Sequence, residues 1–296
     1  MFLRPRPLHR LRHQLPHPPL HRHRPAETVT METVIMATVI TEAEIPVMEI
    51  QLMEAETPGT VTVDTMTDTA AKLKWRHELK FEIGREKGYL ISGHLGKIFK
   101  RDSNAGSHGI YRVSSLYFDD LYDRALREKL NGTDQREKLR LRYYNEDTDY
   151  IRLELKLKRS GLCAKLQQQL SKAEGEKLIA CDMDEGQRPF AGPLNLYAER
   201  IRNRIIRPSA IVCYDREAFI YGPGNVRITI DRHIRGSGEI DRFFDAGRHD
   251  IPFMGNHDVL ELKYDGFLPD MVREVMKGYG LMPSSCSKYV SCRRYG

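Results

Sequence analysis

The chain has 296 residues, of which 30% are charged, and its formal net charge is +6. No apolar run approaches the roughly 20 residues that a membrane-spanning helix needs, so we expect a soluble, cytoplasmic protein with no membrane segment of its own. The five cysteines show no C-x-x-C spacing, which argues against a disulfide framework or a zinc site and fits a reducing compartment.

Residues 1–72 differ in composition from the rest of the chain. Arg, His and Pro make up most of the first two dozen residues, and no Lys or Arg occurs from Glu27 to Asp68. Neither a helical period nor a strand alternation persists there, so we interpret residues 1–72 as a disordered, low-complexity tail and favour a non-native extension. An organelle transit peptide is a less favoured alternative, because the Pro and His content opposes an amphipathic helix.

Residues 73–296 are expected to form the folded domain, and positive charge is concentrated in them. The tail through Asp68 carries six Arg against nine acidic residues, so the remainder carries a formal charge of about +9. Such a basic domain predicts a phosphate-rich partner, which would be nucleic acid, anionic lipid or a small polyphosphate.

The pattern from Trp75 to Lys158 predicts mainly strands. In chain order we expect a strand over 75–83, a helix over 86–100, a strand over 111–118, a short helix to Leu130, and strands over 137–144 and 150–158. Asp119 and Asp120 are interpreted as an acidic turn, and Asp123 as the cap of the short helix. The last two strands, joined by a polar turn, form a hairpin.

The pattern after Ala164 predicts helices first and strands later. In chain order we expect helices over 164–179 and 194–204, strands over 209–220 and 226–231, a surface stretch to Asn256, a strand over 258–264 and a helix over 269–277. The segment Gly222-Pro-Gly-Asn225 is a hairpin turn, and Ser284 to Arg294 is interpreted as a polar tail. Seven or eight strands with a few flanking helices predict an α+β domain built on an antiparallel sheet.

Charged and polar residues occupy every second position of several of these strands. Alternate side chains of a strand point to the same face, so each strand would present its charges on one face and its apolar residues on the other. A single such strand is an ordinary edge with a solvated face. Several together predict a sheet curled into a closed tunnel, whose charged interior would need a polyanion inside it.

Most candidate functional residues are basic. Arg matches phosphate oxygens with a planar fork, and Lys supplies a compact charge. Cations gathered in one lumen would repel one another unless an anion or interleaved carboxylates offset them. The candidates are Lys80, Lys138, Arg140, Arg142, Lys156, Arg216, Arg227, Lys263 and Lys288.

Three glutamates share strand faces with these cations. A salt bridge on the same face is the favoured role of Glu78 and Glu154. Glu261 is favoured as a ligand of Mg²⁺ or Mn²⁺, with substrate phosphates completing the coordination shell. Tyr214 could donate its hydroxyl group to a phosphate, although an aromatic strand residue more often serves packing.

Seven segments of the folded part follow one another in a recognisable order. They are Arg76-His-Glu-Leu-Lys80-Phe, Lys138-Leu-Arg-Leu-Arg142-Tyr, Leu153-Glu-Leu-Lys156, Tyr214-Asp-Arg216-Glu-Ala-Phe, Val226-Arg-Ile-Thr-Ile-Asp231, Leu260-Glu-Leu-Lys263 and Ser287-Lys288-Tyr-Val. As a set they resemble the VTC-type polyphosphate polymerase domain, which belongs to the triphosphate tunnel metalloenzymes. The resemblance covers about 75–290 and leaves the tail outside it.

The resemblance implies a basic tunnel in which the γ-phosphoryl group of ATP moves onto a growing inorganic polyphosphate chain, with Mn²⁺ or Mg²⁺. Position by position, it implies that phosphates are gripped by Lys80, Arg140, Arg142, Lys156, Arg216, Arg227 and Lys288, with hydrogen bonds from Tyr214 and Ser287 and the metal on Glu261. Our candidate catalytic residues are therefore Arg140, Arg142, Lys156, Arg216 and Arg227. Our candidate substrate-binding residues are Lys80, Lys138, Tyr214, Lys263, Ser287 and Lys288.

One departure from the superfamily pattern bears on the reaction. The related hydrolases and cyclases carry Glu-x-Glu-x-Lys on the first strand, whereas Arg76 replaces the first Glu in this chain. The replacement removes a metal carboxylate and favours the polymerase branch.

Two other functions stay open at this point. A metal-dependent triphosphatase would use the same tunnel with water as the acceptor, and a non-catalytic module would only bind polyphosphate. Nucleic acid is not expected, because the charge alternates within strands beside carboxylates instead of clustering on a helix or loop among exposed aromatics. A membrane partner is possible, because such domains can belong to larger assemblies, but it is not indicated, since we find no anchor in the sequence.

Overall fold

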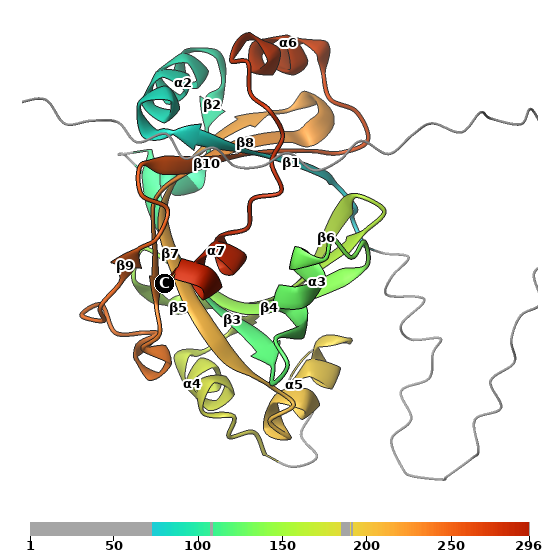
Figure 1. Cartoon of the computed structure of the whole chain (residues 1–296), viewed down its shortest axis with the longest axis vertical. Coiled ribbons are helices and arrows are strands. Elements are labelled where there is room, and N and C mark those ends of the chain that lie inside the picture. The colour runs from blue at the N-terminus through green and yellow to red at the C-terminus, as the bar shows by residue number, and fades with distance from the viewer. Residues whose placement is uncertain (1–72, 107–108, 185–189, 191, 296) are drawn as a thin grey trace, which may run out of the picture. The chain divides into compact units, whose positions relative to one another are not determined.

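The computed structural model describes residues 73–106, 109–184, 190 and 192–295. The predicted tail, residues 1–72, lies outside them. Eight strands form one antiparallel sheet, in which every neighbouring pair is antiparallel (Figure 1). In spatial order they are β1 (His77–Gly84), β10 (His257–Tyr264), β8 (Val226–Ser237), β7 (Ile206–Tyr221), β3 (Ile110–Asp120), β4 (Arg136–Tyr144), β5 (Asp147–Arg159) and β6 (Leu162–Leu170).

Short strands and helices complete the fold. The strands β2 (Lys100–Arg101) and β9 (Ile251–Pro252) pair with β7 and β8. The α-helices are α2 (Arg85–Ile98), α3 (Arg124–Leu130), α4 (Lys172–Ala180), α5 (Leu194–Arg202), α6 (Asp270–Gly278) and α7 (Lys288–Tyr295). Single 3₁₀ turns occur at η1 (Ser103–Ala105), η2 (Pro223–Asn225) and η3 (Ile240–Arg242). The predicted α+β class, the antiparallel sheet and its strand number are confirmed.

The sheet is strongly curled, which brings its two edges towards each other (Figure 1). Arg76, directly before β1, and Cys163 on β6 form an antiparallel bridge with two backbone hydrogen bonds of 2.9 Å. No other pairing between β1 and β6 is recorded in the described part of the chain. Closure along the whole edge therefore stays a prediction.

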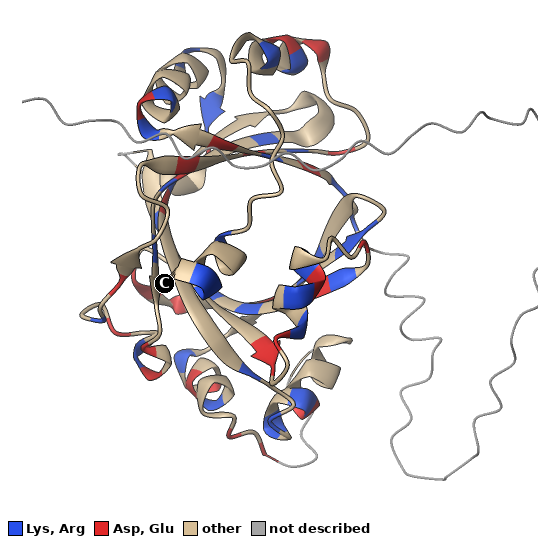
Figure 2. Ribbon diagram, viewed as in Figure 1, with Lys and Arg blue, Asp and Glu red and all other residues tan. Residues whose placement is uncertain are grey.

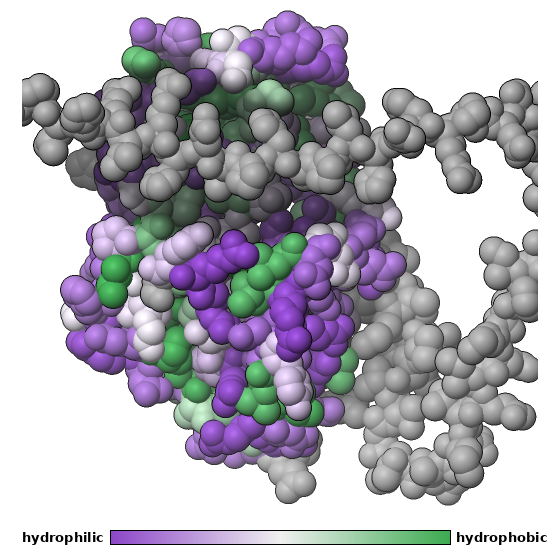
Figure 3. Space-filling model, in the orientation of Figure 1, coloured by the Kyte–Doolittle hydropathy of each residue, from purple (hydrophilic) through white to green (hydrophobic). Residues whose placement is uncertain are grey.

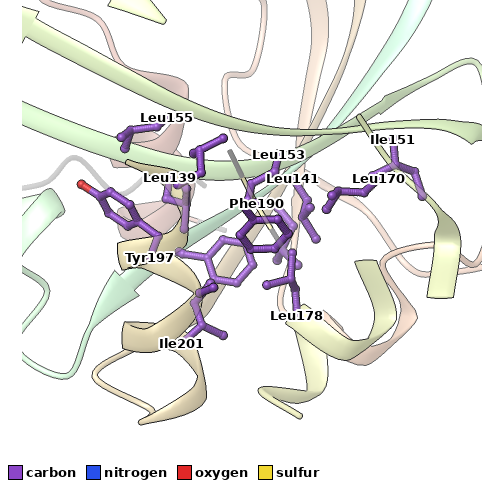
Figure 4. Packing of buried hydrophobic residues seen from close by; sticks show 14 of the residues in the cluster. Leu139, Leu141, Ile151, Leu153, Leu155, Leu170, Leu178, Phe190, Tyr197 and Ile201 are labelled. Atoms are coloured by element: carbon purple, nitrogen blue, oxygen red, sulfur yellow. The ribbon is translucent and has the colours of Figure 1, made fainter. Parts of the chain in front are cut away.

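The apolar faces of the strands pack outward against helices. Leu141 on β4 and Leu153 on β5 are fully buried under α4 and α5, which contribute Leu178 and Ile201 to the same cluster (Figure 4). A second cluster joins β1, β10 and β8 to α2 and α6. These two clusters lie on the outside of the curl. The prediction that the charged faces of these strands turn inward is thus confirmed.

The predicted helix over 164–179 is wrong in its first half and confirmed in its second. Residues 164–170 belong to strand β6, which pairs with β5 along its whole length, and the helix α4 starts only at Lys172. The helix propensity of the Leu-Gln-Gln-Gln run is overridden by the ladder, because the turn at Ser160 and Gly161 returns the chain beside β5. A capping box at Ser171 and Glu174 marks the true helix start.

The predicted polar tail from Ser284 to Arg294 is also wrong, because Lys288–Tyr295 form the helix α7. Tyr289 and Cys292 of this helix are buried in a cluster with Tyr117, Val212 and Tyr214 of β3 and β7. Helix α7 therefore packs against the inner face of the curled sheet, and Figure 1 shows it inside the curl.

The acidic residues after β3 also differ from expectation. Asp119 and Asp120 are the last residues of β3 and not a turn beyond it. The side chain of Asp123 caps nothing in α3; instead, Asp119 accepts hydrogen bonds from the backbone of Ala125 and Leu126. Asp119 therefore caps α3, because its carboxylate accepts from backbone N–H groups in the first turn of the helix.

The predicted surface stretch to Asn256 is partly wrong. Strand β8 continues to Ser237, and Phe243 beyond it is fully buried against Tyr143, whose hydroxyl group donates to the Phe243 carbonyl at 2.9 Å. The other predicted strands and helices are confirmed within a few residues. No helix in the described residues is both long and apolar enough to cross a bilayer.

Candidate functional site

The charged faces of the strands meet around one cavity inside the curl, with a volume of about 200 Å³. Figure 2 shows charged segments on most of the strands that surround it. Eleven Lys and Arg side chains and two Glu side chains line it, together with Tyr117, Tyr214, Tyr289 and three serines. Of the sequence-predicted residues, it collects Lys80, Lys138, Arg140, Arg142, Lys156, Tyr214, Arg216, Glu261, Lys263, Ser287 and Lys288.

Two carboxylates on neighbouring strands hold the lysines at the centre of the cavity. Glu78 on β1 accepts from Lys156 of β5 with both oxygens at 2.7 Å. Glu261 on β10 accepts from Lys288 of α7 at 3.0 Å. Lys80 and Lys263 each lie within 3.6 Å of both carboxylates and so bridge them.

A buried arginine lies next to this centre. Arg216 on β7 grips Asp231 on β8 with two hydrogen bonds of 2.6 and 2.7 Å, and Lys288 lies 2.6 Å from the same carboxylate. Asp231 is fully buried. Burial opposes its charge, but Arg216 and Lys288 outweigh that effect and lower the pKa of Asp231.

The hairpin of β4 and β5 supplies two further arginines. Arg140 lies opposite Glu154 in the strand register and donates to it at 2.8 Å, while Lys165 of β6 reaches the other carboxylate oxygen at 2.8 Å. Arg142 donates to Ser115 at 3.0 Å and to the Tyr214 hydroxyl group at 3.2 Å. These hydrogen bonds hold both guanidinium groups in place, and each group keeps further N–H donors that can bind an anion.

The hydroxyl group of Tyr117 is a site feature that the sequence did not reveal. Arg140 donates to it at 3.2 Å. Burial raises the pKa of Tyr117, but the charges of Arg140 and Arg142 outweigh burial, so the pKa is lowered. No sequence signal marked this residue, because β3 does not carry charged residues at every second position.

The lysines of the cavity differ in how well their charge is stabilised. Burial opposes the charge of Lys80, but Glu261 and Glu78 outweigh it and raise its pKa. Lys138 has no carboxylate partner among the described residues; burial, followed by repulsion from Lys80 and Lys156, holds its pKa well below the usual range. Its ammonium group donates to the Ser287 hydroxyl group at 3.4 Å and lies 4.8 Å from the centroid of the Tyr289 ring.

Arg227 lies apart from the other predicted residues, in an adjoining cavity of about 670 Å³. It is paired with Asp102 and donates to the Tyr111 hydroxyl group at 2.9 Å. This cavity shares Arg140, Arg142, Lys156, Arg216 and other residues with the first, so the two are continuous. Its remaining wall includes His77, Asn104, Tyr111, Tyr144, Asn145 and Tyr150.

Several lining residues were absent from the sequence-based site. Arg136 and Lys158 extend the same alternation by one step at the ends of β4 and β5, so the pattern itself could have found them. Lys129 comes from helix α3, outside any strand pattern. Glu78 was expected to pair along its own strand, whereas its shortest ion pair reaches across to Lys156 of β5.

A divalent metal can be accommodated only in part by protein ligands. No group of three or more His, Cys, Asp or Glu side chains suited to a metal occurs within the described residues. Glu78 and Glu261 do present hard oxygen donors to the same cavity. That donor set fits Mg²⁺ or Mn²⁺, which are held by one or two carboxylates when substrate phosphates supply further oxygens.

One comparison with known proteins identifies the type of domain. A model of the VTC domain family matches residues 75–295. No curated protein sequence matches the chain.

Three solved structures resemble the chain at low identity. A proposed adenylate cyclase from Bacillus halodurans is 14% identical, with a TM-score of 0.46 over 73% of this chain and 95% of that one. A proposed adenylyl cyclase from Hippeastrum, described as having a dominant triphosphatase activity, is 14% identical, with a TM-score of 0.45 over 75% and 95%. PH1819 from Pyrococcus horikoshii OT3 is 12% identical, with a TM-score of 0.40 over 72% and 96%.

Proposed function

The chain belongs to the VTC domain family, and on this premise we propose that it is a polyphosphate polymerase. It transfers the γ-phosphoryl group of ATP to a growing inorganic polyphosphate chain inside a closed, basic tunnel formed by residues 73–296. The observation that carries this proposal is the cavity inside the curl, where eleven Lys and Arg side chains surround a space backed by buried carboxylates. The bridge between Arg76 and Cys163 supports closure of the tunnel, since it joins the two edges of the sheet.

Phosphoryl transfer requires the protein to align the two reacting phosphates and to neutralise the charge on the transferring group; it requires no covalent bond to the protein. A terminal phosphate oxygen of the chain forms a bond to the γ-phosphorus, the bond from that phosphorus to the β-phosphate oxygen breaks, and ADP leaves. The attacking oxygen is already ionised at neutral pH, so no general base is required. Arg140, Arg142 and Lys156 would neutralise the charge on the transferring group, and Arg216 and Lys288 would hold the adjacent phosphates.

The position of Arg76 supports a polymerase over a hydrolase. Its guanidinium group turns to Asp265, at 2.7 Å, and does not line the central cavity. Glu78 and Glu261 would therefore hold Mn²⁺ or Mg²⁺ without the second first-strand carboxylate that related hydrolases carry at the position of Arg76. The bound ion would neutralise part of the charge that develops on the transferred phosphoryl group.

The adjoining cavity supports a nucleoside triphosphate as the donor. Its wall carries Tyr111 and Tyr144, whose ring centroids lie 5.9 Å apart, and Tyr150, which stacks with Arg152 at 4.4 Å. Aromatic rings of this kind can stack on a base, and the amides of Asn104 and Asn145 can hydrogen-bond to it or to the ribose. The triphosphate would then extend from this cavity to Arg140 and Lys156, which line both.

Product analysis tests the proposal. The full chain is incubated with ATP and Mn²⁺, and the phosphate products are separated by length. We expect long chains and ADP. Arg140→Ala and Lys156→Ala should each lower turnover by more than roughly tenfold, because each removes a cation from the transition state.

Two further variants and three alternative outcomes complete the test. Glu261→Gln should abolish most activity, whereas Lys172→Ala, at an exposed position on α4, should change nothing. Free phosphate as the main product would instead indicate a triphosphatase, and binding without turnover would indicate a non-catalytic module. Unchanged synthesis in both Arg140→Ala and Glu261→Gln would show that the site is assigned wrongly.

A further inference from the structure

The cations around the central cavity fall into two classes. At its centre, Lys80, Arg140, Lys156, Arg216 and Lys288 each lie in an ion pair with a carboxylate. The second class has no ion pair with any carboxylate of the described ranges 73–106, 109–184 and 192–295. This unpaired group consists of Lys129, Arg136, Lys138 and Lys158.

The register of the β4–β5 hairpin explains how the two classes arise. Arg140 lies opposite Glu154, an attractive pair. Two residues further along the hairpin, Lys138 lies opposite Lys156. Two residues beyond that pair, Arg136 lies opposite Lys158. Like charges directly opposite each other destabilise a sheet, so the folded protein carries unfavourable electrostatic energy at this end of the hairpin.

Other elements add positive charge to the same place instead of offsetting it. Lys129 comes from α3, and its pKa is lowered by burial and then by Arg136, Lys80 and Lys158. The loop before α7 contributes Ser284, Ser285 and Ser287, which are neutral hydrogen-bonding groups. Figure 3 shows hydrophilic residues around α3 and α7 on this face of the protein.

A solvated surface does not account for the unpaired group. All four side chains line the cavity inside the curl, and all four residues are only partly exposed. Partial burial and then the neighbouring cations, Lys80 first among them, hold the pKa of Lys138 well below the usual range. Cations held together in this way without carboxylates are the arrangement that a polyanion would relieve.

We propose that the unpaired group, Lys129, Arg136, Lys138 and Lys158, is a separate subsite for the internal phosphates of a polyphosphate chain longer than triphosphate. The inference rests on the proposed function and adds to it, because it separates the groups that hold the reacting phosphates from those that retain the chain. Triphosphate occupies the paired centre alone. A longer chain occupies both and therefore binds more tightly.

Binding measurements without ATP test this subsite directly. The full chain is titrated with sodium triphosphate and with a longer polyphosphate of defined length, at one fixed ionic strength. The wild type should bind the longer chain more tightly. The double variant Lys129→Gln/Lys158→Gln should lose about tenfold in affinity for the longer chain, as expected for two charge-assisted contacts, and less than about twofold for triphosphate.

A matched control separates local from global charge. Lys172→Gln/Lys177→Gln removes the same two charges from exposed positions of α4, and it should leave both affinities unchanged. The melting temperature without ligand provides a second measurement. Because Lys129→Gln/Lys158→Gln removes like-charge repulsion, this variant should melt no lower than the wild type.

The outcomes distinguish this inference from the proposed function. Equal losses for triphosphate and the longer chain would overturn the inference, as would an unchanged affinity for the longer chain or a wild type that binds both ligands equally. A wild type that retains the selective binding but makes no polyphosphate from ATP would overturn the polymerase proposal and leave the subsite in place.

Discussion

Each central cation of the cavity is positioned by a carboxylate from a different element. Lys156 of β5 pairs with Glu78 of β1, Arg216 of β7 with Asp231 of β8, and Lys288 of α7 with Glu261 of β10. Buried pairs of this kind add little to stability, because desolvation cancels most of the attraction, but removing one partner is costly. Their main effect is to fix the cations in place before phosphate arrives.

The lone lysine of the β4 strand makes the site sensitive to pH. The groups that face Lys138 are Lys80, Lys156, Lys129, Arg136, Ser287 and Tyr289, and none of them is a carboxylate. Burial and the neighbouring cations lower its pKa, so its charge is lost at a lower pH than that of an ordinary lysine. Affinity for polyphosphate should therefore fall as the pH rises through this lowered pKa.

Lys138→Arg tests that source of the pH dependence. Arginine stays protonated at every accessible pH, so the alkaline fall in polyphosphate affinity should move to higher pH in the variant. Polyphosphate titrations across the alkaline range measure the shift. If the affinity for polyphosphate falls at the same alkaline pH in both proteins, another group is responsible for the titration.

At the scale of elements, α7 shows what the sequence pattern could not reveal. Lys288 was predicted as a phosphate ligand from the family resemblance, but its segment was interpreted as a polar tail because it is rich in Ser, Lys and Arg. The helix is stabilised by long-range contacts: the Tyr289 hydroxyl group donates to Asp119 at 2.5 Å, and Arg293 donates to Asp123 at 2.8 Å. Such partners, some 170 positions away in the chain, leave no local pattern.

Removal of one of these contacts should loosen α7. Tyr289→Phe deletes the hydroxyl group that donates to the buried Asp119, and we expect a loss of about 1–2 kcal/mol in the free energy of unfolding. Tyr295→Phe, at an exposed position of the same helix, should change it by less than about 0.5 kcal/mol. Denaturant unfolding measures both, and equal effects of the two variants would contradict the docking role of Tyr289.

The boundary between strand β6 and helix α4, unlike helix α7, had a signal in the local sequence. A helix was predicted over 164–179 because Leu, Gln and Lys favour helices, yet the signal for the true boundary was present in the sequence as Ser171 and Glu174, three residues apart. Local propensity failed because pairing with β5 is a tertiary contact. The capping box was correct because it acts within a single turn.

At the scale of the whole domain, strand alternation predicted the arrangement well. In the strands that carry the alternation, it identified which face turns inward, because a period of two is fixed by backbone geometry. It could not place Lys129 or Tyr117, since Lys129 lies on a helix and Tyr117 lies on β3, which lacks the charge alternation. It also could not show that the interior consists of two cavities, with Arg227 and Tyr111 in the second one.

The central claim is that cations from separate strands hold linked phosphates inside the curled sheet. The most direct test is a crystal structure of the full chain with bound triphosphate. We predict phosphate density within the cavity, in contact with Arg140, Lys156 and Lys288. Density found only on the outer surface, with the cavity holding water alone, would contradict the account.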